Sequence, residues 1–275
     1  MKKRKTISPV RILFYIILIS YAVITLGPFI WSFITSLKPT SETDNFTVNF
    51  SQLSFKNYGY IFTNFPFLRW LLNSIIIASV VSIGNLVFNS MAGYALARIN
   101  FPGRKYLFLA ILGMMMIPGQ VVMVPTYMLL SKLGWMNTYM GMTIPFLTNM
   151  FLIFLMRQFF LGIPKELEEA AAIDGLGRFG TFFRIVLPMA TTALTTQFIL
   201  VFTGNWNSFM WPSLIATSSD MYTLPVGLNS FKGQYFQFPD QVLAGAMLLS
   251  LPMIAVFLIF QKKFIKGIAS TGGKE

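Results

Sequence analysis

The stretch KELEEAAAIDGLGRFGTFFRIVLP, from Lys165 to Pro188, is the most polar run in a chain otherwise dominated by apolar residues. It contains three glutamates, one aspartate, three alanines and three glycines, and apolar segments lie on both sides of it. The hydrocarbon core of a bilayer rarely holds so many charges. The stretch is therefore predicted to be a loop outside the bilayer, and the rest of the fold is placed around it.

The composition indicates a polytopic membrane protein. Of 275 residues, 55% are hydrophobic and only 11% are charged, a balance far from that of a water-soluble domain. The chain has no cysteine and no histidine. Disulfides, thiolate or imidazole metal sites, and catalytic dyads that need cysteine or histidine are thereby excluded. We predict no catalytic residues, no metal site and no cofactor bound by this chain.

Six apolar windows are long enough to cross about 30 Å of hydrocarbon. They lie near residues 12–34, 69–96, 106–130, 140–161, 188–212 and 241–262. The first window is too long for the apolar core of a signal peptide, so we keep it as a helix. The predicted fold is all-α. It comprises a cytoplasmic N-terminus over 1–11, a six-helix transmembrane domain over 12–263 that includes a cytoplasmic loop at 164–188, and a cytoplasmic tail over 264–275.

The basic residues set the predicted orientation. Sixteen of the 21 lysines and arginines lie on the side shared by both termini, the 98–105 loop and the 162–187 loop, and five lie on the opposite side. Such a bias places the richer side in the cytoplasm. Both termini and the polar loop are then cytoplasmic. This topology accounts for the formal charge of +12, so no nucleic-acid partner is predicted.

The polar loop is predicted to form a helix, a glycine turn and a second helix. Pro164 suits a first helical turn, and the three glutamates after it complement the positive end of the helix dipole. The alanines at 170–172 offer a small-residue surface to another protein, and Gly175 and Gly177 permit a sharp bend. Residues at the spacing of one apolar helical face follow: Phe179, Phe182, Phe183, Val186 and Leu187.

From physics alone, this hairpin is either an interfacial connector between two crossings or a docking element for another protein. Its residue spacing resembles, without a gap, the EAA loop in the permease subunits of ABC importers. The matching residues are Glu169, Ala170, Ala171, Gly175, Ile185, Leu187 and Pro188. The segments at 133–145, 205–212 and 223–231 are similar to the carbohydrate-uptake branch of these permeases, and to its shorter, six-helix subunit of the maltose-transporter type.

The resemblance implies the type I ABC importer permease fold and one half of a heterodimeric translocation pore. It also implies a second permease subunit, two ATPase subunits that use ATP and Mg, an extracytoplasmic sugar-binding protein, and a bacterial or archaeal cell membrane as the location. The chain itself has no phosphate-binding loop of the G-x-x-x-x-G-K-[ST] type. It is therefore expected to be non-catalytic, with ATP hydrolysis in separate subunits.

The resemblance also implies a role for each matching loop residue. Glu169 would make charged contacts with the ATPase, and Ala170 and Ala171 would allow close packing. Gly175 would form the turn, with Asp174 before it as a local cap. The residues that would connect the loop to the fifth crossing are Ile185, Leu187 and Pro188.

Neutral polar residues at membrane depth are candidates for a sugar path. Amides offer hydrogen bonds to sugar hydroxyls, and aromatic rings offer apolar faces to sugar rings. The candidates are Asn85, Asn89, Asn149, Asn205, Trp206 and Asn207. Interhelical hydrogen bonding is the alternative role for such side chains. Four prolines within apolar windows predict helix kinks: Pro118, Pro125, Pro145 and Pro252.

Three alternatives to a sugar importer stay open. An ABC importer for a non-sugar solute would carry the same docking loop, because the loop indicates coupling and not cargo. An ion-coupled secondary transporter is less favoured because no Asp, Glu or His lies within the six windows, although sodium coupling needs only backbone and hydroxyl oxygens. A membrane scaffold would bind an ATPase and transport nothing.

Overall fold

The computed structural model describes residues 9–234 and 238–272, and within these ranges the chain contains helices and no strand. The chain divides into two compact units. One comprises residues up to Phe65 together with Leu228–Leu251, and the other comprises Pro66–Gly227 together with the chain from Pro252. The predicted N-terminal segment at 1–11 lies mostly outside the described residues, as does the end of the predicted tail at 264–275.

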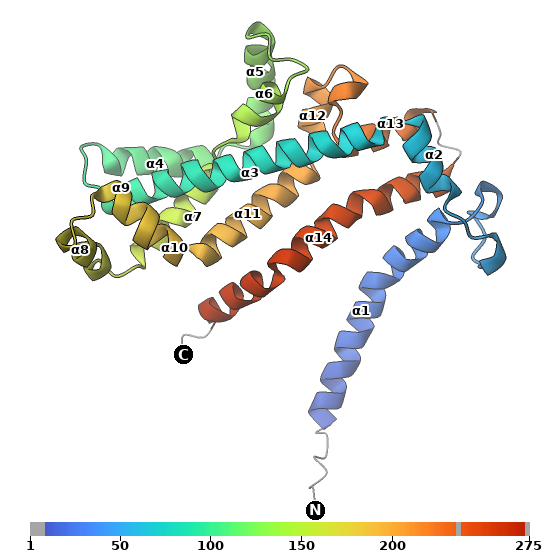
Figure 1. Cartoon of the computed structure of the whole chain (residues 1–275), viewed down its shortest axis with the longest axis horizontal. Coiled ribbons are helices and arrows are strands. Elements are labelled where there is room, and N and C mark those ends of the chain that lie inside the picture. The colour runs from blue at the N-terminus through green and yellow to red at the C-terminus, as the bar shows by residue number, and fades with distance from the viewer. Residues whose placement is uncertain (1–8, 235–237, 273–275) are drawn as a thin grey trace, which may run out of the picture. The chain divides into compact units, whose positions relative to one another are not determined.

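Three helices are each long and apolar enough to cross a membrane: α1 (Pro9–Ser36), α3 (Phe67–Arg98) and the Pro239–Gln261 part of α14 (Pro239–Gly272). Three pairs of shorter helices pass the same test together but meet at a bend, so the described chain holds up to six crossings. Figure 1 shows the elements in chain order. The predicted six crossings and all-α class agree with the structure.

The third predicted window, 106–130, forms two helices and not one. α4 (Arg104–Met115) and α5 (Gly119–Lys132) meet at 99°, and Figure 1 shows α5 directed away from α4. Pro118 stands immediately before α5, where the missing N–H of proline removes no helical hydrogen bond. The kink predicted at Pro118 is therefore a sharp turn of 99° between two separate helices.

The fourth window is bent less sharply. α6 (Tyr139–Thr143) and a 3-10 turn at Ile144–Phe146 meet α7 (Met150–Leu161) at 43°. Pro145 lies in the 3-10 turn, and Asn149 begins α7 by accepting a hydrogen bond from the Leu152 N–H at 3.2 Å. A side-chain cap of this kind starts a new helix at the break.

The fifth predicted window, 188–212, is not one helix, and the prediction is wrong at its C-terminal end. α11 (Thr191–Trp206) stops at Asn207, and α12 (Met210–Ile215) follows as a separate helix. Asparagine and serine at 207 and 208 favour helix ends over helix interiors, because their side chains compete for backbone hydrogen bonds. At its N-terminal end, α11 is bent by 78° from the helical segment Arg178–Met189.

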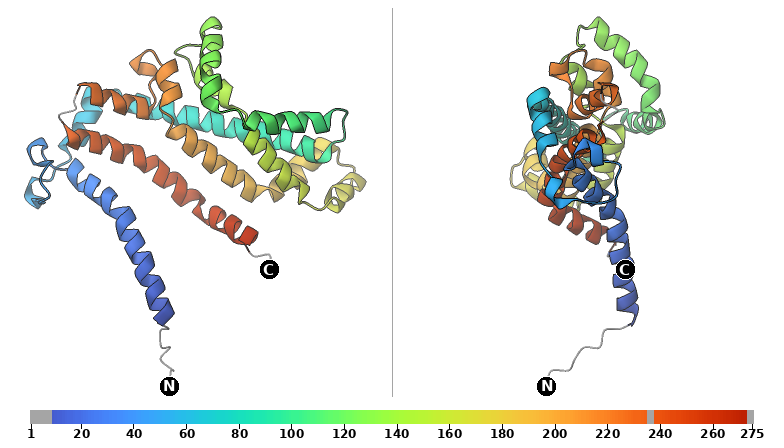
Figure 2. Two further views of the ribbon diagram at one scale, coloured as in Figure 1. Left: turned by 180° about the vertical axis from the view of Figure 1, so that it is seen from behind. Right: turned by 90° about the vertical axis from the view of Figure 1, so that its right-hand side faces the viewer.

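The larger unit is built around α3. This helix lies between α7 and α11, and α4 packs on α7, as Figure 1 and Figure 2 show. Gly93 brings α3 so close to α7 that a Cβ at this position would lie 2.7 Å from the Cβ of Met156. The buried core between the helices includes Ile77, Val81, Leu152, Val201 and Ile215.

The two ends of α3 hold different elements. Near its N-terminal end, the Trp70 indole donates to the Ser219 carbonyl at 2.9 Å, and Asn73 donates to the carbonyls of Asp220 and Tyr222, each at 2.8 Å. α8 (Glu166–Ile173) and α9 (Arg178–Thr181) lie at its C-terminal end (Figure 1). α3 thus joins the predicted outer loops of this unit to its polar hairpin.

The smaller unit contains α1, α2 (Lys56–Asn64), two 3-10 turns at Thr40–Glu42 and Phe50–Gln52, and the first part of α14. α13 (Leu224–Gln234) contributes to both units. Within the smaller unit, Lys38 is buried and donates to the Asn45 carbonyl at 2.6 Å. This hydrogen bond holds together the segment that follows α1.

Candidate functional site

The polar hairpin begins with α8, whose limits follow from its sequence. Three glutamates occupy the first turn, where they favour the positive end of the helix dipole. At the other end Gly175 has a φ of +81°, a left-handed conformation that a glycine adopts without strain. Its N–H donates to the Ala172 carbonyl at 3.1 Å, and the Leu176 N–H donates to the Ala171 carbonyl at 2.9 Å. These two bonds form a Schellman motif, so the predicted helix and glycine turn are present.

The second half of the hairpin differs from its prediction. α9 is followed by a π-helical turn at Phe182–Val186 and by α10 (Leu187–Met189). A π-turn bonds residue i to i+5 and is wider than an α-turn, so residues four apart align on it. Phe182, Val186 and Ala190, spaced four residues apart, are buried. Phe179 and Phe183, which belong to the predicted apolar face, are exposed, so only part of that face packs on the rest of the unit.

The exposed side of α8 is a stripe of four residues at helical spacing: Glu166, Glu169, Ala170 and Ile173. We call these residues the exposed stripe. Ile173 is 87% exposed, which is unusual for a large apolar side chain in a polar loop. Ile173 was not predicted from the sequence, although its distance of four residues from Glu169 places it on the same side of a helix. The stripe combines charge, a small residue and an apolar end.

The buried side of α8 faces the rest of its own unit. Ala171 is only 4% exposed, so its side chain packs on its own unit and does not belong to the exposed stripe. Ala170 and Ala172 are exposed, and Asp174 lies at the C-cap position through its backbone. The three remaining loop candidates lie past the glycine turn, where Ile185 and Leu187 are half-buried and Pro188 is exposed.

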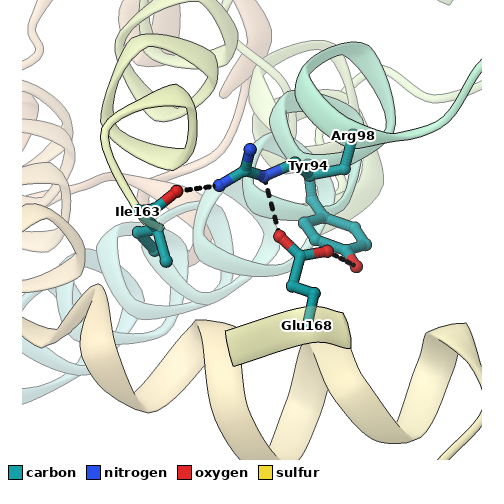
Figure 3. A network of polar contacts seen from close by, with 4 residues as sticks. All are labelled: Tyr94, Arg98, Ile163 and Glu168. Atoms are coloured by element: carbon teal, nitrogen blue, oxygen red, sulfur yellow. Dashed lines mark hydrogen bonds and ion pairs between the residues drawn. The ribbon is translucent and has the colours of Figure 1, made fainter. Parts of the chain in front are cut away.

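Glu168 points away from the exposed stripe into a network of polar contacts (Figure 3). Its Oε1 lies 2.7 Å from Nε of Arg98, and its Oε2 accepts a hydrogen bond from the Tyr94 hydroxyl at 2.9 Å. Arg98 also donates to the Ile163 carbonyl. The side chains of Arg98 and Glu168 are 6% and 18% exposed. This network was not predicted from the sequence; its signals are a basic residue at the end of a crossing and a glutamate on the buried side of α8.

Hydrophobic packing holds the Tyr94 ring of this network in place. The Tyr94 ring centroid lies 5.9 Å from that of Phe160 and 5.0 Å from that of Phe182. These rings belong to one buried cluster that also contains Met156 and Val186. The cluster joins α3, α7 and the π-turn. The hairpin is therefore packed on the helices of its unit, whereas an interfacial connector would rest chiefly on lipid.

Three of the amide candidates for a sugar path form a second network, in the middle of the helices. Asn85 donates to the carbonyls of Val81 and Phe146 at 2.8 and 2.6 Å, and Asn89 donates to Oδ1 of Asn85 at 2.8 Å. The Asn89 Oδ1 accepts from the Asn149 N–H at 3.1 Å. Asn85 and Asn89 are fully buried. Their amides thus hold the break before α7 against α3, as interhelical packing requires.

The same network reaches α11. Gln197 is buried and donates from Nε2 to the Asn85 carbonyl at 2.6 Å. A backbone carbonyl that accepts this bond is already used by its own helix, so the glutamine adds a second donor to it. The contact ties α11 to α3 at the level where Asn85 holds the break. Asn85 of α3 therefore contacts both the turn before α7 and α11.

The remaining path candidates lie along α11. Asn205 is half-buried and donates to the Val201 carbonyl at 2.9 Å, while Asn207 is exposed. Trp206 is buried, and its ring stacks on that of Phe202 at 5.9 Å, so it serves the core. Asn149 and Asn205 both line a groove of about 330 Å³. The other residues that line it are Asn85, Phe146, Thr148, Phe151, Leu152, Leu200, Val201 and Gly204.

Comparison with known proteins gives consistent matches. Residues 89–270 match the family described as binding-protein-dependent transport system inner membrane component. The arabinooligosaccharides transport system permease protein AraQ of Halalkalibacterium halodurans is 38% identical, with 99% of each chain covered. The trehalose/maltose transport system permease protein MalG of Thermococcus litoralis is 33% identical, with 94% of this chain and 95% of that protein covered.

A solved structure shares the fold. It is a chain from a bacterial ABC transporter involved in the import of the acidic polysaccharide alginate. The match has a TM-score of 0.80 and 24% identity, and it covers 95% of this chain and 100% of that chain.

Proposed function

Because the chain belongs to the family of binding-protein-dependent transport system inner membrane components, we propose that it forms one half of a heterodimeric pore in an ATP-driven sugar importer. The observation that carries this proposal is the exposed stripe of α8. The stripe lies on a hairpin that is packed against α3 and α7, and it presents Glu169 and Ile173 outward. A rigid base with an exposed, mixed face suits the docking of another protein.

The docked partner in this proposal is an ATPase subunit. The chain has no phosphate-binding loop, which supports this assignment. In the proposal, ATP and Mg belong to two separate ATPase subunits, and this chain is a non-catalytic subunit. Glu169 contacts the ATPase by charge, Ala170 allows close approach, and Gly175 shapes the end of the docking helix.

The proposed orientation places both termini and α8 in the cytoplasm of a bacterial or archaeal cell. The excess of basic residues on that side supports it. The opposite side then receives sugar from an extracytoplasmic binding protein. A second permease subunit completes the pore, and the two halves alternate between inward-facing and outward-facing states as the ATPases close and open.

The groove along α11 supports a neutral sugar as the cargo. Thr148, Asn149 and Asn205 supply hydroxyl and amide groups, and Phe146 and Phe151 supply ring faces. Among the residues that the structure describes, none that lines the groove is charged. A carboxylate or phosphate would find no cation there to offset its loss of hydration, which disfavours an acidic solute. We therefore place arabinooligosaccharides and maltose before acidic oligosaccharides as substrates.

Purification from native membranes tests the assembly. A tag on this chain should recover a second permease and an ATPase, and the complex should then be reconstituted into liposomes with its binding protein. Uptake of arabinooligosaccharides, maltose, trehalose and alginate oligosaccharides is compared with and without ATP. ATP-dependent uptake of a neutral sugar is the expected result.

Other outcomes would refute the proposal in separate parts. Recovery of the chain without an ATPase, followed by uptake driven by an ion gradient, would indicate a secondary transporter. Recovery of the ATPase without uptake of any solute would indicate a scaffold. Uptake of the acidic oligosaccharide alone would refute the neutral cargo and leave the assembly standing.

A further inference from the structure

The inward side chain of α8 has a role that the docking function leaves unassigned. We propose that Glu168, Arg98 and Tyr94 form a positioning site that makes α8 and α3 move as one body, so that a displacement of α8 reaches the middle of the helix bundle. This inference rests on the proposed function, because the displacement comes from an ATPase. Adjacent glutamates then have separate tasks, with Glu169 facing outward and Glu168 facing inward.

Each of the two carboxylate oxygens of Glu168 contacts a different side chain of α3. One carboxylate oxygen lies 2.7 Å from Nε of Arg98, and the other accepts from the Tyr94 hydroxyl at 2.9 Å. Arg98 and Tyr94 are one helical turn apart on α3, so both oxygens are tied to the same helix. Two contacts on one carboxylate fix its orientation as well as its distance. Rotation or sliding of α8 along α3 would break at least one of them.

Arg98 extends the site to the chain between α7 and α8. Its guanidinium donates to the Ile163 carbonyl, two residues past the end of α7. The peptide that leads into α8 is thereby held by the same side chain that pairs with Glu168 (Figure 3). The start and the buried face of α8 are both connected to the last residue of α3.

The position of Tyr94 is itself fixed. Its ring packs between Phe160 of α7 and Phe182 of the π-turn, with centroid distances of 5.9 and 5.0 Å. One residue before it, Gly93 lies against Met156 and Arg157 without room for a Cβ. The tyrosine hydroxyl is therefore a donor on a closely packed base, and it cannot follow Glu168 if α8 moves alone.

A displacement passed to α3 would travel along an unbroken helix. α3 runs from Phe67 to Arg98, and Asn89 lies about 13 Å from Arg98 along the axis at 1.5 Å per residue. Asn89 and Asn85 hold the break before α7 and contact α11 through Gln197. The same helix thus carries the positioning site at one end and the amide network at its middle. Movement of α8 would reach the groove by this route.

The test uses distance measurements on the assembled transporter. The chain has no cysteine, so Met91→Cys on α3 and Ala172→Cys on α8 add two spin-label sites at exposed positions. The label-to-label distance is measured by pulsed electron paramagnetic resonance, without nucleotide and with ATP plus orthovanadate. We expect one narrow distance that is the same in both states, because the two helices move together.

Two variants then remove the site without removing its bulk. Glu168→Gln abolishes the charge, and Tyr94→Phe removes only the hydroxyl and keeps the ring packing. Each should broaden the distance distribution and lower ATP-dependent uptake about fivefold or more, the lower end of the range for coupled sites, while the ATPase still copurifies. Tyr106→Phe, at an exposed tyrosine of α4, is the matched control and should change neither quantity.

Several results would overturn the inference. A wild-type distance that changes between the nucleotide states would show that α8 moves relative to α3. Unchanged distance and uptake in both variants would remove the role of the site and leave the proposed function intact. Absence of the ATPase from the wild-type preparation would instead remove the proposed function, and the inference with it.

Discussion

Asn89→Leu separates packing from substrate binding at the middle of α3. Asn89 is fully buried, donates to Asn85 at 2.8 Å and accepts from the Asn149 N–H at 3.1 Å. Leucine has a similar volume and makes neither bond. An average side-chain bond between membrane helices contributes about 0.6 kcal/mol, and with the same value for the bond to Asn85 within α3 the two lost bonds cost about 1.2 kcal/mol. The buried Asn85 oxygen left without a donor adds about 1 to 3 kcal/mol. We expect a total loss of about 2 to 4 kcal/mol in the free energy of unfolding.

The assay for this prediction is equilibrium unfolding in mixed micelles, followed by circular dichroism, for the wild type and the variant. Asn207→Leu is the matched control, since Asn207 is exposed just after α11 and its replacement should change stability by less than about 0.5 kcal/mol. Sugar uptake is measured in parallel. If Asn89→Leu unfolds like the wild type but loses uptake, then Asn89 serves the substrate and the packing argument is wrong.

Four further substitutions test the docking hairpin, the helix crossing and the groove. Glu169→Lys and Gly175→Val should each prevent copurification of the ATPase while membrane insertion is unchanged. Glu169→Lys reverses an exposed charge. Gly175→Val places a β-branched residue at a φ of +81°, which costs roughly 1 to 2 kcal/mol. Normal recovery of the ATPase with both variants would refute the docking assignment. Gly93→Leu should lower the unfolding temperature in a thermal-shift assay, because a Cβ at this position would lie 2.7 Å from the Met156 Cβ. Overpacking of this kind costs about 1 to 3 kcal/mol. An unchanged unfolding temperature would show that α3 and α7 separate freely. Asn205→Leu should raise the KM for sugar uptake and leave the assembled complex intact, and an unaltered KM would exclude this side chain from the path.

The number and placement of the crossings were accessible from the sequence because apolar length is a local property. The corner between α4 and α5 was not, although Pro118 marked its place. A proline removes one hydrogen bond and predicts a bend, whereas the 99° between these helices depends on what each helix packs against. The end of α11 at Trp206 was also missed, since apolar residues continue through Trp211 and Pro212.

The hairpin shows the same division between local and distant causes. The glycine turn was predicted from Gly175 and Gly177, and Gly175 has the left-handed conformation that a glycine adopts without strain. The different directions of Glu168 and Glu169 could be derived from helical spacing only once the buried face was known. That face is set by Arg98 and Tyr94, which lie about 70 residues earlier in the chain. The buried amides Asn85 and Asn89 were selected by residue type, but sequence composition does not reveal their partners on other elements, which are the Phe146 carbonyl and the Asn149 N–H.

The uninterrupted course of α3 makes the chain intolerant of a change in length between Asn89 and Arg98. One inserted residue would rotate the Tyr94 and Arg98 end by about 100° relative to the amide end, so only one of the two networks would retain its partners. An insertion of four residues would return the rotation to within about 40° but lengthen the helix by about 6 Å. Related chains should therefore accept insertions in the loops on either side of α3 and keep this interval at a constant number of residues.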